Sequence, residues 1–379
     1  MKLAIPKERR DNETRVAASP ETVKKLTALG FDVIVEAGAG LASSVSDAQF
    51  QDAGATIAAD AAAAMGDADV IFKVRGPDTD EISKMKRGAV LAAMLNPHQS
   101  KDTNNALASA GVTSFAMELM PRITRAQSMD VLSSQSNLAG YKAVIDAAEL
   151  FTRAFPMMMT AAGTVAPARV FVMGAGVAGL QAIATAKRLG AVVSATDVRA
   201  AAAEQVESLG GKFVMVEPDE GDTGETAGGY AKEMSEDYKK RQAALVAETF
   251  AKQDIVITTA LIPGRPAPVL VTEEMVRSMK PGSIVVDLAV EAGGNCPLSE
   301  PGEIVDVDGV KIMGHRNVPG RLSDDASSLY AKNLLNFITP LVDKETGALT
   351  IDWEDEIITG TLISKDGQVV HPALKEGAA

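Results

Sequence analysis

Residues 169–197, RVFVMGAGVAGLQAIATAKRLGAVVSATD, decide the fold of this chain. They start with an apolar run, continue with Gly174, Gly176 and Gly179 in GxGxxG spacing, and end with a second apolar run and Asp197. In such a unit the first glycine allows a tight turn and the second lets a pyrophosphate approach the helix N-terminus. The third glycine lets the helix lie close to the sheet. The stretch therefore predicts a Rossmann unit that binds a dinucleotide.

Asp197 lies about 20 residues beyond the glycines, at the end of the second predicted strand. A carboxylate there accepts hydrogen bonds from the adenosine ribose and repels a 2'-phosphate, which favours NAD(H) over NADP(H). Arg199 keeps NADP(H) open as an alternative, because an arginine near this position can hold the 2'-phosphate. Four neighbouring positions complete the predicted cofactor contacts on this side: Val177, Val198, Ala260 and Leu261.

Short β-branched runs alternate with Ala-rich amphipathic stretches along most of the chain, which is typical of parallel α/β domains. The first series is LAIP (3–6), VIVEAG (33–38), VIFKV (70–74), AVLAAML (89–95) and TSFAME (113–118). The second is RVFVMGAG, AVVSATD, KFVMVE, DIVITTA, SIVVDLAV and VKIMGH. We expect two Rossmann-like, doubly wound, parallel-sheet domains joined by long helices, with an NAD cleft between them.

Two long helices, at Ser128–Phe155 and Ser323–Phe337, are expected to bridge the domains. The tail TLISKDGQVV predicts a hairpin around a Lys-Asp-Gly turn that packs on the first domain. The predicted domains are therefore residues 1–134 plus 316–379, and residues 135–315. The polar stretch Pro218–Lys240, which contains GETAGGY, predicts either a mobile active-site loop or an ordinary surface excursion.

Composition excludes several classes of function. The 379 residues carry a net charge of -13, so no basic field attracts nucleic acid or anionic lipid. Cys296 is the single cysteine and only three histidines are present, so we expect no disulfide and no Cys/His metal site. The N-terminus lacks the long apolar core of a signal peptide. No apolar window reaches the roughly 18 residues of a membrane span, and a soluble, cytoplasmic chain is expected.

Proton-transfer chemistry has few candidates in this sequence. A dehydrogenase of small hydroxy or amino acids needs a general acid or base near the hydride site, usually a histidine. His98, His315 and His371 are the three available, and each is interpreted as a loop or packing residue.

Several longer motifs carry a resemblance to a known family. IPKERRDNETRVAASP, FKVRGP, GAGVAG and VDLAVEAGGN are similar to the superfamily of alanine dehydrogenases and transhydrogenase NAD subunits. MELMPRITRAQSMDVLSSQSNLAGYKAV and ETAGGYAKEM resemble more closely the NAD(H)-binding subunits of proton-translocating NAD(P) transhydrogenases. The resemblance covers essentially the whole chain.

The resemblance implies that the loop Arg122–Ser133 contacts the nicotinamide. Arg122 would lie near the ring, Gln127 would reach towards the partner's NADP ribose, and Asp130 and Ser133 would fix the carboxamide. Such amide, carboxylate and hydroxyl groups have the matching donors and acceptors. The alternative for Arg122 and Asp130 is a local ion pair that caps the next helix, with Ser128 or Asp130 as the cap.

The resemblance also implies that Tyr230 closes over the nucleotide, with Gly228 and Gly229 as the hinge. The catalytic set is then Arg122, Gln127, Asp130, Ser133 and Tyr230. The implied cofactor contacts add Ile123, Thr124, Arg125 and Gly229 to the residues of the loop and of the Rossmann unit.

The two branches of the family differ in chemistry. In alanine dehydrogenases the resemblance implies that Arg15 and Lys73 would meet the substrate carboxylate, while a histidine and an aspartate handle protons and substrate. Asn96 and Glu291 stand at those positions here. Asparagine cannot exchange a proton near neutral pH, unless His98 takes that role. Direct hydride transfer moves no substrate proton and depends on positioning. Arg15 and Lys73 are then relics of a pocket, or they join the domains by ion pairs.

The resemblance implies NADP(H)-binding and membrane-spanning transhydrogenase subunits as partners. We expect a homodimer held by them on the cytoplasmic face of the inner membrane, with no further nucleotide-binding domain in this chain. AFPMMMTAAGTV (154–165) is the candidate for subunit contact, and burial inside one protomer is the alternative. Two other functions stay open: a self-sufficient alanine or amino-acid dehydrogenase, and a non-catalytic NAD(H) sensor.

Overall fold

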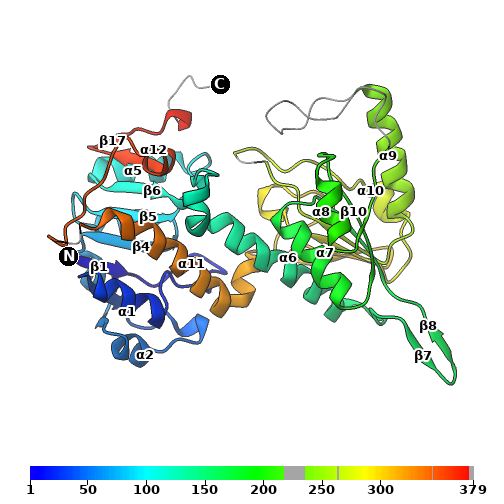
Figure 1. Cartoon of the computed structure of the whole chain (residues 1–379), viewed down its shortest axis with the longest axis horizontal. Coiled ribbons are helices and arrows are strands. Elements are labelled where there is room, and N and C mark those ends of the chain that lie inside the picture. Colours follow the sequence, from blue (N-terminus) through cyan, green and yellow to red (C-terminus); the bar gives the residue numbers. More distant parts are fainter. Residues whose placement is uncertain (217–234, 263, 344, 375–379) are drawn as a thin grey trace. The chain divides into compact units, whose positions relative to one another are not determined.

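The computed structural model describes residues 1–216, 235–262, 264–343 and 345–374 (Figure 1). The chain divides into two compact units. Unit 1 comprises Met1–Gln135 and Pro319–Ala379, and unit 2 comprises Ser136–Val318. Unit 1 is therefore discontinuous in sequence, and each unit is described by itself below.

Unit 2 is built on a seven-stranded sheet of order β11-β10-β9-β12-β13-β15-β14. Its strands are β9 Arg169–Met173, β10 Val192–Thr196, β11 Lys212–Phe213, β12 Ile255–Thr258, β13 Ile284–Asp287, β14 Ile304–Val307 and β15 Val310–Met313. All neighbours pair in parallel except β14 and β15. Strand order reverses between β9 and β12, and in open α/β sheets this is the place where ligands bind.

Alternation along the strands of unit 2 explains why helices cover both faces of the sheet. Val170 and Val172 of β9 join one apolar cluster, whereas Phe171 and Met173 join the other. Side chains with a period of two point to opposite faces, so a strand that is apolar throughout is buried on both. The surrounding helices are α7 Val177–Arg188, α8 Ala202–Ser208, α9 Glu236–Phe250 and α10 Glu273–Arg277.

Unit 1 repeats this arrangement in an eight-stranded sheet of order β17-β16-β6-β5-β4-β1-β2-β3. Its strands are β1 Lys2–Ile5, β2 Asp32–Glu36, β3 Thr56–Ala58, β4 Val70–Arg75, β5 Val90–Met94, β6 Thr113–Ala116, β16 Leu362–Lys365 and β17 Gln368–Val369. β16 runs antiparallel to β6 and pairs with β17 as the predicted hairpin. The reversal of strand order lies between β1 and β4.

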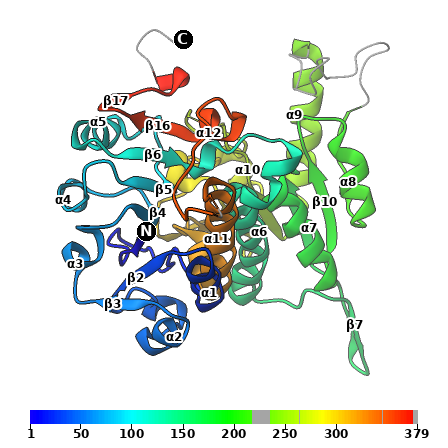
Figure 2. The same ribbon diagram turned by 60° about the vertical axis from the view of Figure 1, so that its left-hand side comes forward.

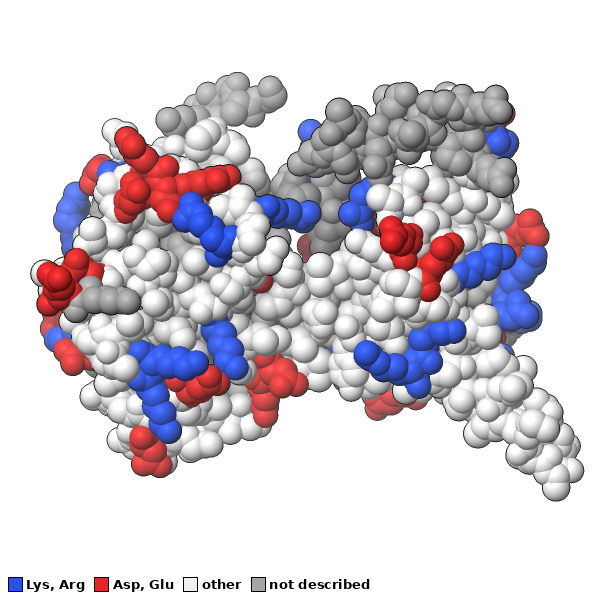
Figure 3. Space-filling model, in the orientation of Figure 1, with Lys and Arg blue, Asp and Glu red and all other residues white. Residues whose placement is uncertain are grey.

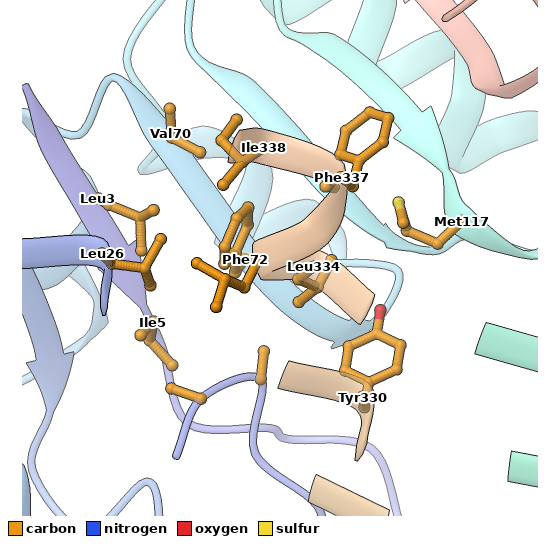
Figure 4. Close-up of a cluster of buried hydrophobic side chains, with 14 of the residues drawn as sticks. Leu3, Ile5, Leu26, Val70, Phe72, Met117, Tyr330, Leu334, Phe337 and Ile338 are labelled. Carbon is orange, nitrogen blue, oxygen red and sulfur yellow. The ribbon is translucent and has the colours of Figure 1, made fainter. Parts of the chain in front are cut away.

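The C-terminal segment supplies some of the core of unit 1. Helix α11 (Ser323–Ile338) places Leu334, Phe337 and Ile338 in the same buried cluster as Phe72 of β4 (Figure 4). It also packs against α1, as both ribbon views show (Figure 2). The remaining helices of unit 1 are α1 Pro20–Ala28, α2 Asp47–Asp52, α3 Ala61–Met65, α4 Thr79–Ser83, α5 Lys101–Ala110 and α12 Glu356–Thr361.

Helix α6 (Val131–Leu150) is shorter than the predicted helix Ser128–Phe155. Asp130 accepts a hydrogen bond from the backbone N–H of Ser133 at 3.0 Å, which starts the helix after it. At the other end, Phe151 and Phe155 are buried, and Pro156 disfavours helix in the residue before it. Further 3-10 turns are η1 Leu41–Ser43, η2 Met117–Leu119, η3 Thr124–Met129, η4 Val290–Ala292, η5 Val318–Leu322, η6 Thr339–Leu341 and η7 Pro372–Leu374.

An exposed hairpin, β7 (Met158–Thr160) and β8 (Gly163–Val165), follows α6. Met157, Met158 and Met159 are 61%, 43% and 82% exposed. The alternative that this apolar segment is buried within one protomer is therefore wrong for the hairpin, although Phe155 before it is buried. Residues 154–168 contain no charged residue, and the hairpin is white in Figure 3.

The predicted fold class, two Rossmann-like doubly wound sheets, is confirmed. The short strands β3 and β14 were not predicted. In the predicted loop Pro218–Lys240, α9 begins at Glu236, so its last residues are helical, whereas residues 217–234 lie outside the described ranges. Among the helices described, none has the length and apolarity that crossing a bilayer requires.

Candidate nucleotide-binding site

Gly174 turns the chain directly after β9. Its φ is +105°, a left-handed conformation that side chains disfavour. A Cβ at this position would also lie 2.5 Å from Oγ1 of Thr259, whose hydroxyl donates to the Gly174 carbonyl at 3.1 Å. The turn thus requires glycine for both conformation and space, as the sequence predicts.

Gly176 and Gly179 are glycines for two different reasons. At Gly179 a Cβ would lie 1.8 Å from the Gly174 carbonyl oxygen, so only glycine lets α7 lie this close to the sheet. At Gly176 nothing lies within 4 Å of a built Cβ, and φ is an ordinary -76°. Gly176 is the N-cap of α7 and makes no side-chain cap bond. The helix N-terminus therefore faces open space, as an incoming pyrophosphate requires.

Asp197 follows β10, and its side chain is 7% exposed. One carboxylate oxygen accepts from the backbone N–H of Ala175 at 2.7 Å, and the other accepts from that of Arg199 at 2.9 Å. Burial raises the pKa of Asp197, but the hydrogen bonds from Arg199 and Ala175 outweigh it and hold the pKa below its usual value. The Arg199 guanidinium lies on this carboxylate, with Nε 3.0 Å from Oδ1. The Asp197 carboxylate is therefore charged at neutral pH.

Apolar side chains lie exposed on the loops beyond three adjacent strands. Val177, Val198 and Leu261 are 41%, 72% and 58% exposed and follow β9, β10 and β12 respectively. Carboxyl ends of neighbouring parallel strands meet at one edge of a sheet. The structure thus gathers the predicted contacts of unit 2 at its strand-order reversal.

Asn295 is a site residue that the sequence did not point out. Its buried amide donates to the carbonyls of Ala260 and Pro268 at 2.9 and 2.8 Å and accepts from the Ala260 N–H at 3.1 Å. This fixes the loop after β12 that carries Ala260 and Leu261. An amide after the pair Gly293 and Gly294 was the available signal, but its partner lies 35 residues away.

The loop Arg122–Ser133 lies in unit 1, where η3 precedes α6. Arg122, Thr124 and Gln127 are exposed, Ile123 is half-buried, and Ala126 is fully buried. The backbone thus presents Gln127 to solvent from a turn that is anchored on the core.

Asp130 and Ser133 bond to each other, because the Ser133 hydroxyl and backbone N–H both donate to the Asp130 carboxylate. Asp130 is thus the cap of α6, as the alternative for this residue proposed. The accompanying ion pair between Arg122 and Asp130 does not form within the described residues of the chain. Arg125 instead binds Asp355 through two bonds of 2.7 Å.

Arg15 and Lys73 are buried near the strand reversal of unit 1. Arg15 bonds Glu13 at 2.7 and 2.6 Å and Gln135 at 2.7 Å, and Lys73 lies 2.8 Å from Glu81. All these partners belong to unit 1. The expectation that Arg15 and Lys73 join the domains by ion pairs is therefore wrong, because both residues are paired locally.

A cavity of about 160 Å³ adjoins Arg15 in unit 1, with Lys7, Glu8, Glu13 and Thr14 among its lining residues. The carboxylates of Glu13 and Glu81 already occupy the donors of Arg15 and Lys73. A substrate carboxylate would have to displace them.

The candidates for proton transfer lie apart from this arrangement. Asn96 is exposed and donates its side-chain amide to Gln99 at 2.8 Å, and Glu291 accepts from the Asn317 N–H at 2.8 Å. Burial lowers the pKa of His371, and burial raises the pKa of the Cys296 thiol. In the described ranges, no group of three or more His, Cys, Asp or Glu side chains is placed to hold a metal ion.

Gly228, Gly229 and Tyr230 lie outside the described residues, so their roles stay predictions. The structure brings together Gly174, Gly176, Gly179, Asp197 and Ala260 in unit 2, and Arg122 to Ser133 in unit 1. That both groups line one NAD cleft also stays a prediction.

A Rossmann sheet of this strand order, with a fitted glycine turn and an acidic residue after its second strand, defines a dinucleotide-binding α/β protein. Family comparison narrows this class. The model for the N-terminal domain of alanine dehydrogenase/PNT matches residues 4–139, and that for the C-terminal domain matches residues 143–372. The chain belongs to the alanine dehydrogenase/PNT family.

Relatives in both branches align over nearly the whole chain. In Rhodospirillum rubrum, the first of the chains that make up NAD(P) transhydrogenase subunit alpha is 64% identical over 379 residues, which is 99% of each chain. Alanine dehydrogenase of Halomonas elongata is 31% identical over 99% of this chain and 96% of its own. A crystal structure of transhydrogenase from Sinorhizobium meliloti superposes with a TM-score of 0.89 at 59% identity, over 98% of this chain and 100% of that one. The predicted resemblance to the transhydrogenase branch is confirmed.

Proposed function

We propose that this chain is the NAD(H)-binding subunit of a proton-translocating NAD(P) transhydrogenase. The observation that carries the proposal is the nucleotide site of unit 2, with an open helix N-terminus at Gly176 and a charged carboxylate at Asp197. High identity to a transhydrogenase subunit alpha supports the transhydrogenase branch over the dehydrogenase branch. Hydride would pass directly between NADH on this chain and NADP⁺ on a partner subunit.

NAD(H) is proposed as the nucleotide of this chain and NADP(H) as that of the partner. Asp197 would accept hydrogen bonds from the adenosine ribose, and its charge would repel a 2'-phosphate. Arg199, which keeps NADP(H) open in the sequence, supports NAD(H) here because its guanidinium lies on Asp197. Attracting a phosphate would require it to leave that carboxylate.

The reaction asks for positioning and no acid or base. A hydride leaves C4 of the reduced nicotinamide and bonds C4 of the oxidised one, so NADH and NADP⁺ become NAD⁺ and NADPH with no proton released. The described residues fit this demand, because Gln127 and Arg122 are exposed hydrogen-bonding groups on an anchored turn. Asn96, which replaces the family's histidine, has no proton to exchange near neutral pH.

The partners are proposed to be a second copy of this chain and the NADP(H)-binding and membrane-spanning subunits. The membrane subunits would couple hydride transfer to proton translocation and hold this chain on the cytoplasmic face of the inner membrane. The exposed, uncharged hairpin around Met159 is the surface proposed for contact between copies. A contiguous apolar surface of this kind marks a protein interaction site.

The deciding experiment measures hydride transfer from NADH to NADP⁺ or to a reducible NADP analogue. The purified chain is assayed alone and then with an added NADP-binding transhydrogenase component. We expect transfer only in the mixture. Gln127→Asn should slow it by roughly 10-fold, the equivalent of one well-placed hydrogen bond. Gln51→Asn, the same change at an exposed position of α2, is the matched control.

Two results would contradict the proposal. Pyruvate- and ammonia-dependent NADH oxidation by the chain alone would make it an alanine dehydrogenase. Tight NADH binding without transfer in the mixture would make it an NAD(H) sensor.

A further inference from the structure

The 3-10 segment η3 (Thr124–Met129) sorts its residues into three rows. Because a 3-10 helix has three residues per turn, side chains three apart lie above one another. Ala126 and Met129 form a buried row, while Thr124 and Gln127 form an exposed row. The third row contains Arg125 and Ser128, and both are bonded to the C-terminal segment of the chain.

Arg125 binds Asp355 with a forked pair of hydrogen bonds, from Nη1 to Oδ2 and from Nη2 to Oδ1, each 2.7 Å long. Such a bidentate pair fixes orientation as well as distance. Asp355 is itself held in place, because it caps α12 by accepting from the Ile357 N–H at 2.7 Å. The hydrogen bonds from Arg125 lower the pKa of Asp355, so the pair is charged at neutral pH.

Two amides of α11 hold the other end of η3. The Ser128 carbonyl accepts from the side chains of Asn333 at 2.9 Å and Asn336 at 3.0 Å. The Asn333 amide oxygen also accepts from the Ser134 hydroxyl at 2.8 Å. Asn333 is 7% exposed, so a single buried amide bridges the end of η3 and the first turn of α6.

Close packing does not fix η3 on this side. A cavity of about 250 Å³ lies between the turn and the C-terminal segment, lined by Arg125 and Met129 on one side and by Phe337, Leu341 and Ile358 on the other. A turn beside such a space has room to shift. The polar bonds therefore set the position of the backbone that carries Gln127.

We infer that Arg125, Asn333, Asn336 and Asp355 form a clamp of positioning residues for hydride transfer. The clamp holds η3 so that Gln127 stands in one place when the two nicotinamides meet. Arg125 accordingly acts through Asp355 and not as a ligand of the cofactor. This inference rests on the proposed function, because it assigns the purpose of holding the loop predicted to contact the nicotinamide.

A double-mutant cycle tests the clamp in the mixture with the NADP-binding component. Arg125→Met and Asp355→Asn are measured singly and together, since asparagine still caps α12. We expect each to lower the single-turnover rate of hydride transfer by about 10-fold, because small displacements of positioning groups have effects of that size. NADH affinity, measured by cofactor fluorescence, should change less than about 2-fold, a split that a merely structural defect would not give. The double variant should be no slower than either single variant, since both remove the same bond.

Lys86→Met is the matched control, because it breaks an ion pair of unit 1 with Asp69 that is similarly exposed and 2.6 Å long. It should leave the transfer rate unchanged. Amide hydrogen exchange gives a second readout that needs no activity. Asp355→Asn should speed exchange selectively within Thr124–Met129.

The outcomes separate this inference from the proposed function. If the unaltered chain transfers hydride and the variants match it, the clamp is wrong and the proposed function stands. If NADH affinity falls as much as the rate, Arg125 binds the cofactor and does not position the loop. If the unaltered chain transfers nothing, the proposed function fails, and unchanged exchange in Asp355→Asn would overturn the clamp on its own.

Discussion

Glu13 is the carboxylate that joins two arginines inside unit 1. Its Oε2 lies 2.6 Å from Arg15 and 3.1 Å from Arg75, and its side chain is 2% exposed. Burial raises the pKa of Glu13, but the hydrogen bonds and charge of Arg15 and the charge of Arg75 outweigh it and lower the pKa to about 2. A neighbouring carboxylate behaves oppositely, since burial raises the pKa of Glu8.

The lowered pKa of Glu13 predicts a loss of stability in acid. A carboxylate whose pKa falls from 4.5 unfolded to about 2 folded stabilises the protein above pH 4.5, and this contribution is lost as pH falls towards 2. The full effect is about 3 kcal/mol in the free energy of unfolding. Glu13→Gln should remove this dependence while lowering stability at pH 7. Denaturant unfolding at pH 6, 4.5 and 3 checks it, and an unchanged slope in the variant would contradict it.

At the scale of elements, the turn between β9 and α7 predicts different outcomes for its two later glycines. Gly179→Ala must push α7 from the sheet, because its Cβ would lie 1.8 Å from the Gly174 carbonyl oxygen. We expect a loss of about 1–3 kcal/mol of stability together with NADH binding. Gly176→Ala meets nothing within 4 Å, so it should fold normally. Its methyl group would take the space of the pyrophosphate and weaken NADH binding at least roughly 10-fold.

Thermal unfolding and NADH fluorescence titration separate the two variants. Normal NADH affinity in Gly176→Ala would show that the nucleotide does not lie over this helix N-terminus. A normal melting temperature in Gly179→Ala would show that α7 yields without loss.

Long elements of this chain were predictable because their patterns are local. The apolar strands β9 and β12, and helix α11, were found close to their observed bounds. β3 has only three residues, and β14 is an edge strand that alternates between exposed and half-buried, so neither shows a continuous apolar run. Helix Ser128–Phe155 was predicted too long, because buried phenylalanines after α6 resemble a continuing apolar face.

The candidate site divides in the same way. The glycine turn and Asp197 lie within one short stretch, so spacing alone indicated them. The partner of Arg125 lies 230 residues away at Asp355, and that of Asn295 lies 35 residues away at Ala260. No local pattern predicts such pairs, since folding alone brings them together. The roles of Tyr230 and Gly229 stay predictions.

At the scale of the whole molecule, the exposed hairpin predicts the oligomeric state. We expect light scattering to give twice the chain mass of 39.5 kDa for the unaltered protein. Met159→Asp should give a single chain, because Met159 is 82% exposed and a charge there would have to be desolvated in a contact between copies. Ile304→Asp places the same charge on an exposed apolar position of β14 and should leave the mass unchanged. A dimer that survives Met159→Asp would exclude the hairpin as the main contact.

Unit 1 takes strands from both ends of the sequence, with all of unit 2 in between. During translation, every residue of unit 2 leaves the ribosome before α11 does. At 5–20 residues per second, the apolar strand face formed by Leu3, Ile5 and Phe72 therefore waits roughly 10 s or more for the helix that covers it. The nascent chain exposes that face to molecular chaperones throughout this interval. A message cut short after unit 2 would accordingly yield a nucleotide-binding domain attached to an incomplete, aggregation-prone one.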